Sequence, residues 1–187
     1  ALARAGFRDV VINLGWQGDR LRRALGDDAG LGLRLHWSDE QDVPGALETG
    51  GGIHRALPML GDGPFLVVSG DTWTDYDLTR LRAAKVELAH LVLVPNPPHH
   101  PEGDFLLRGG RVRDRGDGPR YTFGGIAVFH PRFFHGCEAG RYRLAPLLRE
   151  HMESGTVTGE LHRGAWFDPG TPERLDALRE RLAGQRA

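Results

Sequence analysis

With 187 residues, a formal net charge of −1 and 26% charged residues, the chain has the size and composition of a single globular domain spanning residues 1–187. Its mixed charges form neither the basic stripe of a nucleic-acid-binding protein nor an acidic disordered tail, and no apolar run reaches the roughly 18 residues of a membrane-spanning helix. The single cysteine, Cys137, excludes an internal disulfide and suits a cytoplasmic protein.

The first third of the chain predicts strands alternating with helices. The short apolar run 9–13 predicts a buried strand, and residues 17–25 have helical spacing, with Leu21 on the apolar face. Residues 31–37 alternate like a strand. Residues 50–60 predict a helix that begins at a run of three glycines.

The next elements are apolar strands without alternation. Residues 65–69 and 88–94 are almost entirely apolar, and 77–86 between them predicts a helix. Strands of this kind indicate a sheet that is covered on both faces. The strand at 65–69 ends in Gly70-Asp71.

The second half begins with the proline-rich loop 95–103. The further elements expected are a hairpin of 104–108 and 111–113 around Gly109-Gly110, a strand at 121–129, a helix at 144–153, strands at 157–163 and 165–167, and a helix at 172–182 with Thr171 as N-cap. The whole predicts a mixed α/β sheet flanked by helices, in which ligands bind beyond the carboxyl ends of the strands.

Two aspartates stand where such a sheet binds ligands. Asp71 and Asp168 each follow an apolar strand, and two carboxylates with substrate phosphates are enough to hold Mg²⁺. Gly50-Gly51-Gly52 would let a ligand approach the helix start, where free N–H groups and the helix dipole favour an anion. Each feature also has a plain structural interpretation, as an N-cap, an Asp-Pro-Gly turn and a ligand-free glycine turn respectively.

Other polar clusters are better explained by structure than by chemistry. Asp75-Tyr76-Asp77 matches the Asp-X-Asp of nucleotide-sugar glycosyltransferases, but capping of the following helix explains it better. His99-His100 point opposite ways in an extended loop, so we expect solvated residues there and no joint metal site. Cys137 has no evident base nearby, and neither a nucleophile elbow nor a Gly-X-Gly-X-X-Gly loop occurs.

Six segments occur in an order that resembles the sugar-1-phosphate nucleotidyltransferases, and within them the N-acetylmuramate-1-phosphate uridylyltransferase group of peptidoglycan recycling. The segments are Leu47-Glu-Thr-Gly-Gly-Gly-Ile53, Ser69-Gly-Asp-Thr-Trp-Thr-Asp75, Asn96-Pro-Pro-His-His100, Gly103-Asp-Phe105, Tyr121-Thr-Phe-Gly-Gly-Ile126 and Trp166-Phe-Asp-Pro-Gly-Thr-Pro-Glu-Arg-Leu175. The resemblance covers nearly the whole chain and implies a Rossmann-like, GT-A-like fold.

The resemblance also implies a reaction and a site. A sugar 1-phosphate would attack the α-phosphorus of a nucleoside triphosphate such as UTP, giving a nucleotide-sugar and pyrophosphate with Mg²⁺ as cofactor. By resemblance, Asp71 and Asp168 bind the metal. The base and ribose would lie against Glu48, Thr49, Gly50 and Gly51, and the sugar pocket would include Asn96, Asp104 and Gly125.

One part of the family pattern is missing from this sequence. Members begin with a strand and a loop like Leu-Ala-Ala-Gly-X-Gly-X-Arg-X-X-Pro, then Pro-Lys-Pro, and neither occurs here. Residues 1–6 instead read like a last helical turn closed by a glycine, without a starting Met. We therefore expect an N-terminally truncated chain whose sheet lacks its first strand and which is inactive or weak by itself.

Two other functions fit parts of the sequence. A nucleotide-sugar-dependent glycosyltransferase would use Asp75 and Asp77 for its metal. A non-catalytic subunit that senses nucleotide-sugars would tolerate the loss of the phosphate loop, although it has less need of Asp71 and Asp168.

Overall fold

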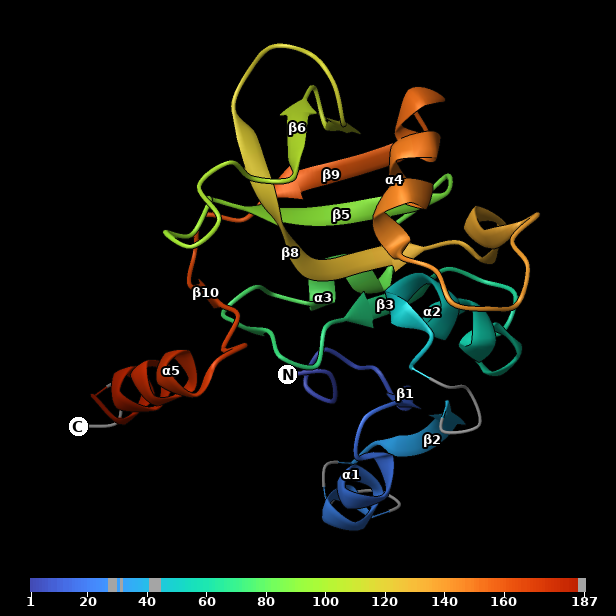
Figure 1. The fold of residues 1–187 in the computed structure, drawn as a ribbon, viewed down its shortest axis with the longest axis vertical. Helices are drawn as coiled ribbons and strands as arrows, with labels where there is room; N and C mark the ends of the chain where they lie inside the picture. Colours follow the sequence, from blue (N-terminus) through green and yellow to red (C-terminus); the bar gives the residue numbers. More distant parts are fainter. Residues whose placement is uncertain (27–29, 31, 41–44, 185–187) are drawn as a thin grey trace.

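A computed structural model describes residues 1–26, 30, 32–40 and 45–184 (Figure 1). Its centre is a six-stranded mixed sheet with the order β3-β8-β5-β9-β7-β6. Its strands are β3 (Phe65–Val68), β5 (Ala89–Val94), β6 (Phe105–Arg108), β7 (Arg111–Arg113), β8 (Arg120–Phe129) and β9 (Val157–Leu161). Only β5 and β9 pair in parallel in this sheet, which confirms the mixed α/β class and adds that most pairs are antiparallel.

Two small sheets flank the central one. The parallel pair β1 (Asp9–Leu14) and β2 (Arg34–Asp39) carries the N-terminal part of the chain. The antiparallel pair β4 (Trp73–Thr74) and β10 (Trp166–Phe167) joins segments more than ninety residues apart in sequence. The sequence did not predict β4, because two residues are too few to show a pattern.

In the part of the chain that the structure describes, six helical segments pack around these sheets or extend from them. They are α1 (Gly18–Leu25), α2 (Glu48–Leu60), α3 (Thr79–Arg82), the 3₁₀ turn η1 (Pro131–Phe134), α4 (Leu144–Glu153) and α5 (Pro172–Gly184). The prediction of a helix over 77–86 was too long, since only one turn forms there. The prediction for α1 was right in extent but wrong in packing, because Leu21 is 40% exposed.

The core explains why the strands lack alternation. Leu91 and Leu93 of β5 pack in one hydrophobic cluster together with side chains of α2 and α4, whereas Val92 packs in a second cluster with Leu78 and Leu81 near α3. Both faces of β5 are therefore covered, as predicted, and all three of its central side chains are fully buried. In Figure 1, α4 crosses one face of this sheet, and α3 lies on the opposite face, next to β8.

A cavity of about 330 Å³ separates β1 from β3. Val10 and Val11 line it from one side and Leu66 and Val68 from the other. Within the described residues neither strand has a partner on this edge, so the two sheets are not joined. The strand predicted at 9–13 forms as β1, but it is less buried than expected, because of its residues only Leu14 is fully buried.

Candidate active site

The pairing of β4 with β10 brings Asp71 and Asp168 to the same end of two neighbouring strands. Phe167 lies opposite Trp73, so Asp168 comes one position after its strand and Asp71 two positions before β4. The side chain of Thr74 donates a hydrogen bond to the carbonyl of Ala165 (2.9 Å), which holds the two segments together. The backbone positions of Asp71 and Asp168 thus lie at the same end of this strand pair.

An arginine and a histidine contact the carboxylate of Asp168. Nη1 of Arg174 lies 3.1 and 3.2 Å from its two oxygens, and Nε2 of His99 lies 3.1 Å from Oδ2. Arg174 is in the first turn of α5, where the hydroxyl of Thr171 accepts a hydrogen bond from its N–H (3.3 Å), consistent with the predicted cap. Asp71 is exposed.

Gly125 lets the loop that carries Asp71 approach β8. The register of β5 against β8 shifts between Val92 and Leu93, so β8 bulges around Gly124-Gly125. Gly125 has φ +72°, and a Cβ there would stand 2.7 Å from the hydroxyl of Ser69 and 2.8 Å from that of Thr72. Its carbonyl accepts a hydrogen bond from Ser69 N–H (2.8 Å). A side chain at this position would therefore displace the loop that carries Asp71.

The other two residues expected in the sugar pocket are engaged by the protein itself. Asn96 donates to the carbonyls of Pro101 (2.8 Å) and Arg120 (3.1 Å) and accepts from the hydroxyl of Thr122 (3.0 Å). These bonds tie the proline-rich loop to β8. Asn96 therefore shapes the wall of this region through its hold on the loop.

Asp104 is held in a similar way. Its Oδ2 accepts a hydrogen bond from Phe123 N–H (2.8 Å), and its Oδ1 lies 3.1 Å from Nε2 of His100. His99 and His100 thus face two different carboxylates, which confirms that they point apart. Both side chains are about 40% exposed, as expected for solvated loop residues, and each also contacts a residue of the candidate site.

The three glycines lie inside α2 rather than in a turn before it, and protein groups occupy the space beside them. A Cβ on Gly50 would meet the ring of Tyr142 at 2.6 Å, and one on Gly51 would meet the carbonyl oxygen of Gly140 at 2.1 Å. The N–H of Gly51 donates to the carbonyl of Tyr142 (3.1 Å). These glycines are thus required by the packing of residues 140–142, and the close approach of a ligand is not needed to explain them.

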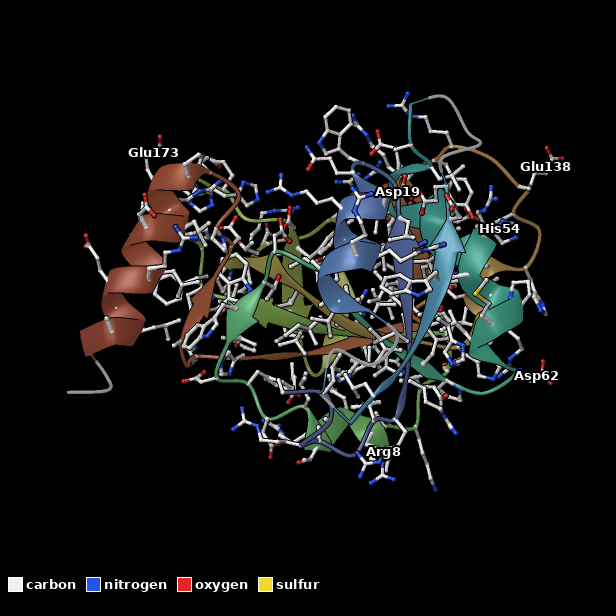
Figure 2. The ribbon with its side chains drawn as sticks, turned by 90° about the horizontal axis from the view of Figure 1, so that it is seen from below. Arg8, Asp19, His54, Asp62, Glu138 and Glu173 are labelled. Carbon is white, nitrogen blue, oxygen red and sulfur yellow. The ribbon has the colours of Figure 1, made fainter. Side chains whose placement is uncertain are left out.

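The first residues of α2 have a polar, accessible surface. Glu48 has φ +59° and pairs with Arg141 (3.1 Å) and Arg143 (4.0 Å), while Thr49 is exposed. Farther along, α2 contacts η1, where the ring of His54 lies 6.5 Å from that of Phe134. Figure 2 shows His54 and Glu138 on one side of the molecule and Glu173, at the start of α5, on the other.

The aspartates of the Asp-X-Asp segment have structural partners. Asp77 accepts from the N–H (3.0 Å) and hydroxyl (2.7 Å) of Thr79 at the start of α3, although the N-cap position itself is Leu78. Asp75 contacts Nε2 of His162 (2.8 Å). A hydrogen bond from the backbone of Ala165, and then the contact with His162, hold the pKa of Asp75 below its usual range.

No group of three or more His, Cys, Asp or Glu side chains that could hold a metal occurs in the part of the chain that the structure describes. Mg²⁺ does not need one, because it binds through one or two carboxylates together with substrate phosphates and water. Over the same described residues, no helix combines the length and apolar composition needed to cross a membrane.

Comparison with known proteins gives two curated relatives over almost the full chain. The chain is 46% identical to an N-acetylmuramate alpha-1-phosphate uridylyltransferase of Neisseria meningitidis serogroup B, over 98% of this chain and 81% of the relative. It is 30% identical to the protein of the same name from Caulobacter vibrioides, over 97% and 81%. No family model matches the sequence.

The fold has solved counterparts at much lower identity. The inositol-1-phosphate CTP transferase from T. maritima superimposes with a TM-score of 0.75 at 17% identity, over 97% of this chain and 78% of that one. At this identity the likeness concerns the fold, which is that of a nucleotidyltransferase with helices flanking a mixed sheet.

Proposed function

Since the chain belongs to the N-acetylmuramate alpha-1-phosphate uridylyltransferase family and is a sugar-1-phosphate nucleotidyltransferase, we propose that it transfers UMP from UTP to N-acetylmuramate 1-phosphate. The observation that carries this proposal is the 46% identity over 98% of the chain to the curated Neisseria meningitidis relative. The products would be the UDP-sugar and pyrophosphate. A cytoplasmic location follows from the supply of UTP.

We propose that Asp71 and Asp168 hold Mg²⁺. The fit is supported by the chemistry of the donors, because the two carboxylates lie at adjoining strand ends and Asp168 already attracts an arginine and a histidine. Hard carboxylate oxygens are what this ion prefers. When bound, the ion would offset the negative charge of the triphosphate.

The chain's own residues have mainly a positioning task. A phosphate oxygen of the sugar 1-phosphate forms a bond to the α-phosphorus of UTP, and the bond from that phosphorus to the bridging oxygen of pyrophosphate breaks. No covalent enzyme intermediate is needed for this displacement. Alignment of two anionic substrates supplies most of the rate enhancement in such reactions.

We propose two walls for the site. Uracil and ribose would lie against the start of α2, at Glu48, Thr49, Gly50 and Gly51, where Thr49 is exposed, Glu48 is partly exposed and the two glycines are buried. Gly125 and the loop tied down by Asn96 and Asp104 would enclose the sugar. Both groups of residues are held by hydrogen bonds within the protein, so these walls need little ordering when substrate binds.

The proposal is tested with protein expressed from its native open reading frame. UTP, N-acetylmuramate 1-phosphate and Mg²⁺ are incubated with the protein, and pyrophosphate and UDP-N-acetylmuramate are measured separately. Parallel reactions with dTTP, CTP or GTP, and with glucose 1-phosphate, test the base and the sugar. Equal turnover of all nucleotides, or none with UTP, would contradict the proposal.

The same assay on the 187-residue chain tests the prediction that these residues alone are inactive or weak, which stays a prediction. The assay also distinguishes a uridylyltransferase from the two other functions considered, a glycosyltransferase and a sensing subunit. A glycosyltransferase would consume a UDP-sugar without releasing pyrophosphate, and a sensing subunit would bind a nucleotide-sugar without turnover.

A further inference from the structure

Glu40 is a buried carboxylate next to the proposed nucleoside wall that the reaction above does not use. It follows β2 directly and is only 6% exposed. Among the described residues no ion pair offsets its charge, since its contacts are neutral N–H donors. Burial of such a charge lowers the stability of the folded protein unless hydrogen bonds or an opposite charge compensate for the lost hydration.

The hydrogen bonds of Glu40 join three elements at one point. Its Oε1 accepts from Nδ2 of Asn13 (2.8 Å), at the end of β1, and its Oε2 accepts from the N–H of Leu47 (3.3 Å), just before α2. The same Asn13 amide donates to the carbonyl of Gly52 inside α2 (2.9 Å). Glu40 and Asn13 together therefore fix how α2 begins relative to β1 and β2.

The sequence of α2 is adapted to this carboxylate. A Cβ on Gly52 would stand 2.7 Å from Oε1 of Glu40 and 3.3 Å from Nδ2 of Asn13. Leu47 is the N-cap residue of α2 and gives no side-chain hydrogen bond to the helix. The Glu40 carboxylate thus lies at the positive end of the helix, where an anion is favoured.

We propose that Glu40 is a positioning residue that makes the start of α2 a wall for the nucleoside and not for phosphate. This inference rests on the proposed function and deepens it. Because Glu40 already supplies the anion at this helix end, a second anion such as the triphosphate is repelled there. Uracil and ribose are neutral and meet no such repulsion, so the nucleotide binds with its base toward α2.

The test compares the wild type with Glu40→Gln, which keeps the size of the side chain and removes its charge. Binding of uridine and of pyrophosphate is measured separately by calorimetry. We expect uridine to bind about tenfold more weakly, because one partner N–H loses its charged acceptor, and pyrophosphate to bind at least as tightly as before. Asp39→Asn is the matched control, with the same change of charge at the neighbouring surface position, and should leave both affinities within about twofold.

The two ligands distinguish positioning from general damage. Equal losses of uridine and pyrophosphate binding, or no change in either, would overturn the inference. If Glu40→Gln does not fold, as judged by its melting curve, Glu40→Asp takes its place. This variant keeps the charge but shortens the side chain, so uridine should bind more weakly while pyrophosphate binding stays at the wild-type level.

Measurements of KM distinguish a failure of the inference about Glu40 from a failure of the proposed function. In an active enzyme, Glu40→Gln should raise the KM for UTP about tenfold and leave the KM for the sugar 1-phosphate unchanged. If the wild type itself transfers no nucleotidyl group, the proposed function fails, and the binding of uridine and pyrophosphate still decides the role of Glu40.

Discussion

The guanidinium of Arg174 lies 3.1 Å from one carboxylate oxygen of Asp168 and 3.2 Å from the other, and 2.8 Å from Nε2 of His99. An arginine six positions along the chain therefore stands beside the carboxylate proposed to bind Mg²⁺. Any cation that binds Asp168 must share it with Arg174, or Arg174 must turn away. The first turn of α5 is in this way connected to the metal site.

Substitution of Arg174 by Gln should tighten Mg²⁺ binding. Two positive charges near one carboxylate repel each other, and at about 4 Å this costs on the order of 1 kcal/mol in a water-like medium. We therefore expect the Mg²⁺ dissociation constant, measured by calorimetry with UTP present, to fall about fivefold. Arg179→Gln on the same helix, where Arg179 pairs with the exposed Asp176, is the control. Weaker binding in Arg174→Gln would instead mean that Arg174 is needed to hold Asp168 in place.

Asp71→Asn and Asp168→Asn should each lower kcat by about 10²–10³-fold, because each removes a carboxylate proposed to hold the Mg²⁺ that offsets the charge of the reacting phosphates. Initial rates of pyrophosphate release at saturating substrates measure this. Asp62→Asn, an exposed aspartate in the turn after α2, should keep full activity (Figure 2). A larger loss in Asp77→Asn than in Asp71→Asn would mean that the metal is held at Asp77 and not at Asp71.

Gly51→Ala should destabilise the protein although alanine is the better helix former. The added Cβ would stand 2.1 Å from the carbonyl oxygen of Gly140, and such overpacking lowers the free energy of unfolding by roughly 1–3 kcal/mol or more. Gly63 has no heavy atom within 4 Å of the corresponding position, so Gly63→Ala should change stability by less than about 0.5 kcal/mol. Urea unfolding of both variants decides the matter, and equal midpoints would show that the loop of residues 140–142 moves aside freely.

His90 should make the protein less stable in mild acid. Burial lowers the pKa of His90 below its ordinary value of 6.5, and Arg80 adds to this while Glu160, 4.0 Å away, opposes it. Between that lower pKa and 6.5 the unfolded chain binds a proton that the folded protein does not, so stability is lost as pH falls through this window. Melting temperatures from pH 7.5 to 5 should fall more steeply for the wild type than for His90→Gln. Parallel curves would show that His90 titrates alike in both states.

Local patterns were enough to predict most of the central sheet. The apolar runs of β3 and β5, the Gly109-Gly110 hairpin and the cap of α5 depend on neighbours in sequence, and the structure contains each of them. The pair β4 and β10 and the short α3 depend on contacts between distant segments. No periodicity in a few residues reveals such contacts.

The residues of the candidate site also fall into those that sequence patterns could single out and those that they could not. Asp71 and Asp168 could be singled out because each follows an apolar strand, and their role as metal ligands stays a prediction. Arg174 and Glu40 were missed, since an arginine in an amphipathic helix and a glutamate after a strand have no distinctive spacing. Their importance comes from partners such as Asp168 and Asn13, which lie far away in the sequence or on another element.

The cavity between β1 and β3 affects which part of the protein unfolds first. No strand hydrogen bonds bridge it among the described residues, so β1, β2 and α1 are attached to the remainder mainly through α2. Such a segment opens at a lower free energy than the core of the sheet. Backbone amides of β1 should therefore exchange with deuterated solvent well before those of β5, and limited proteolysis should cut first within residues 9–39.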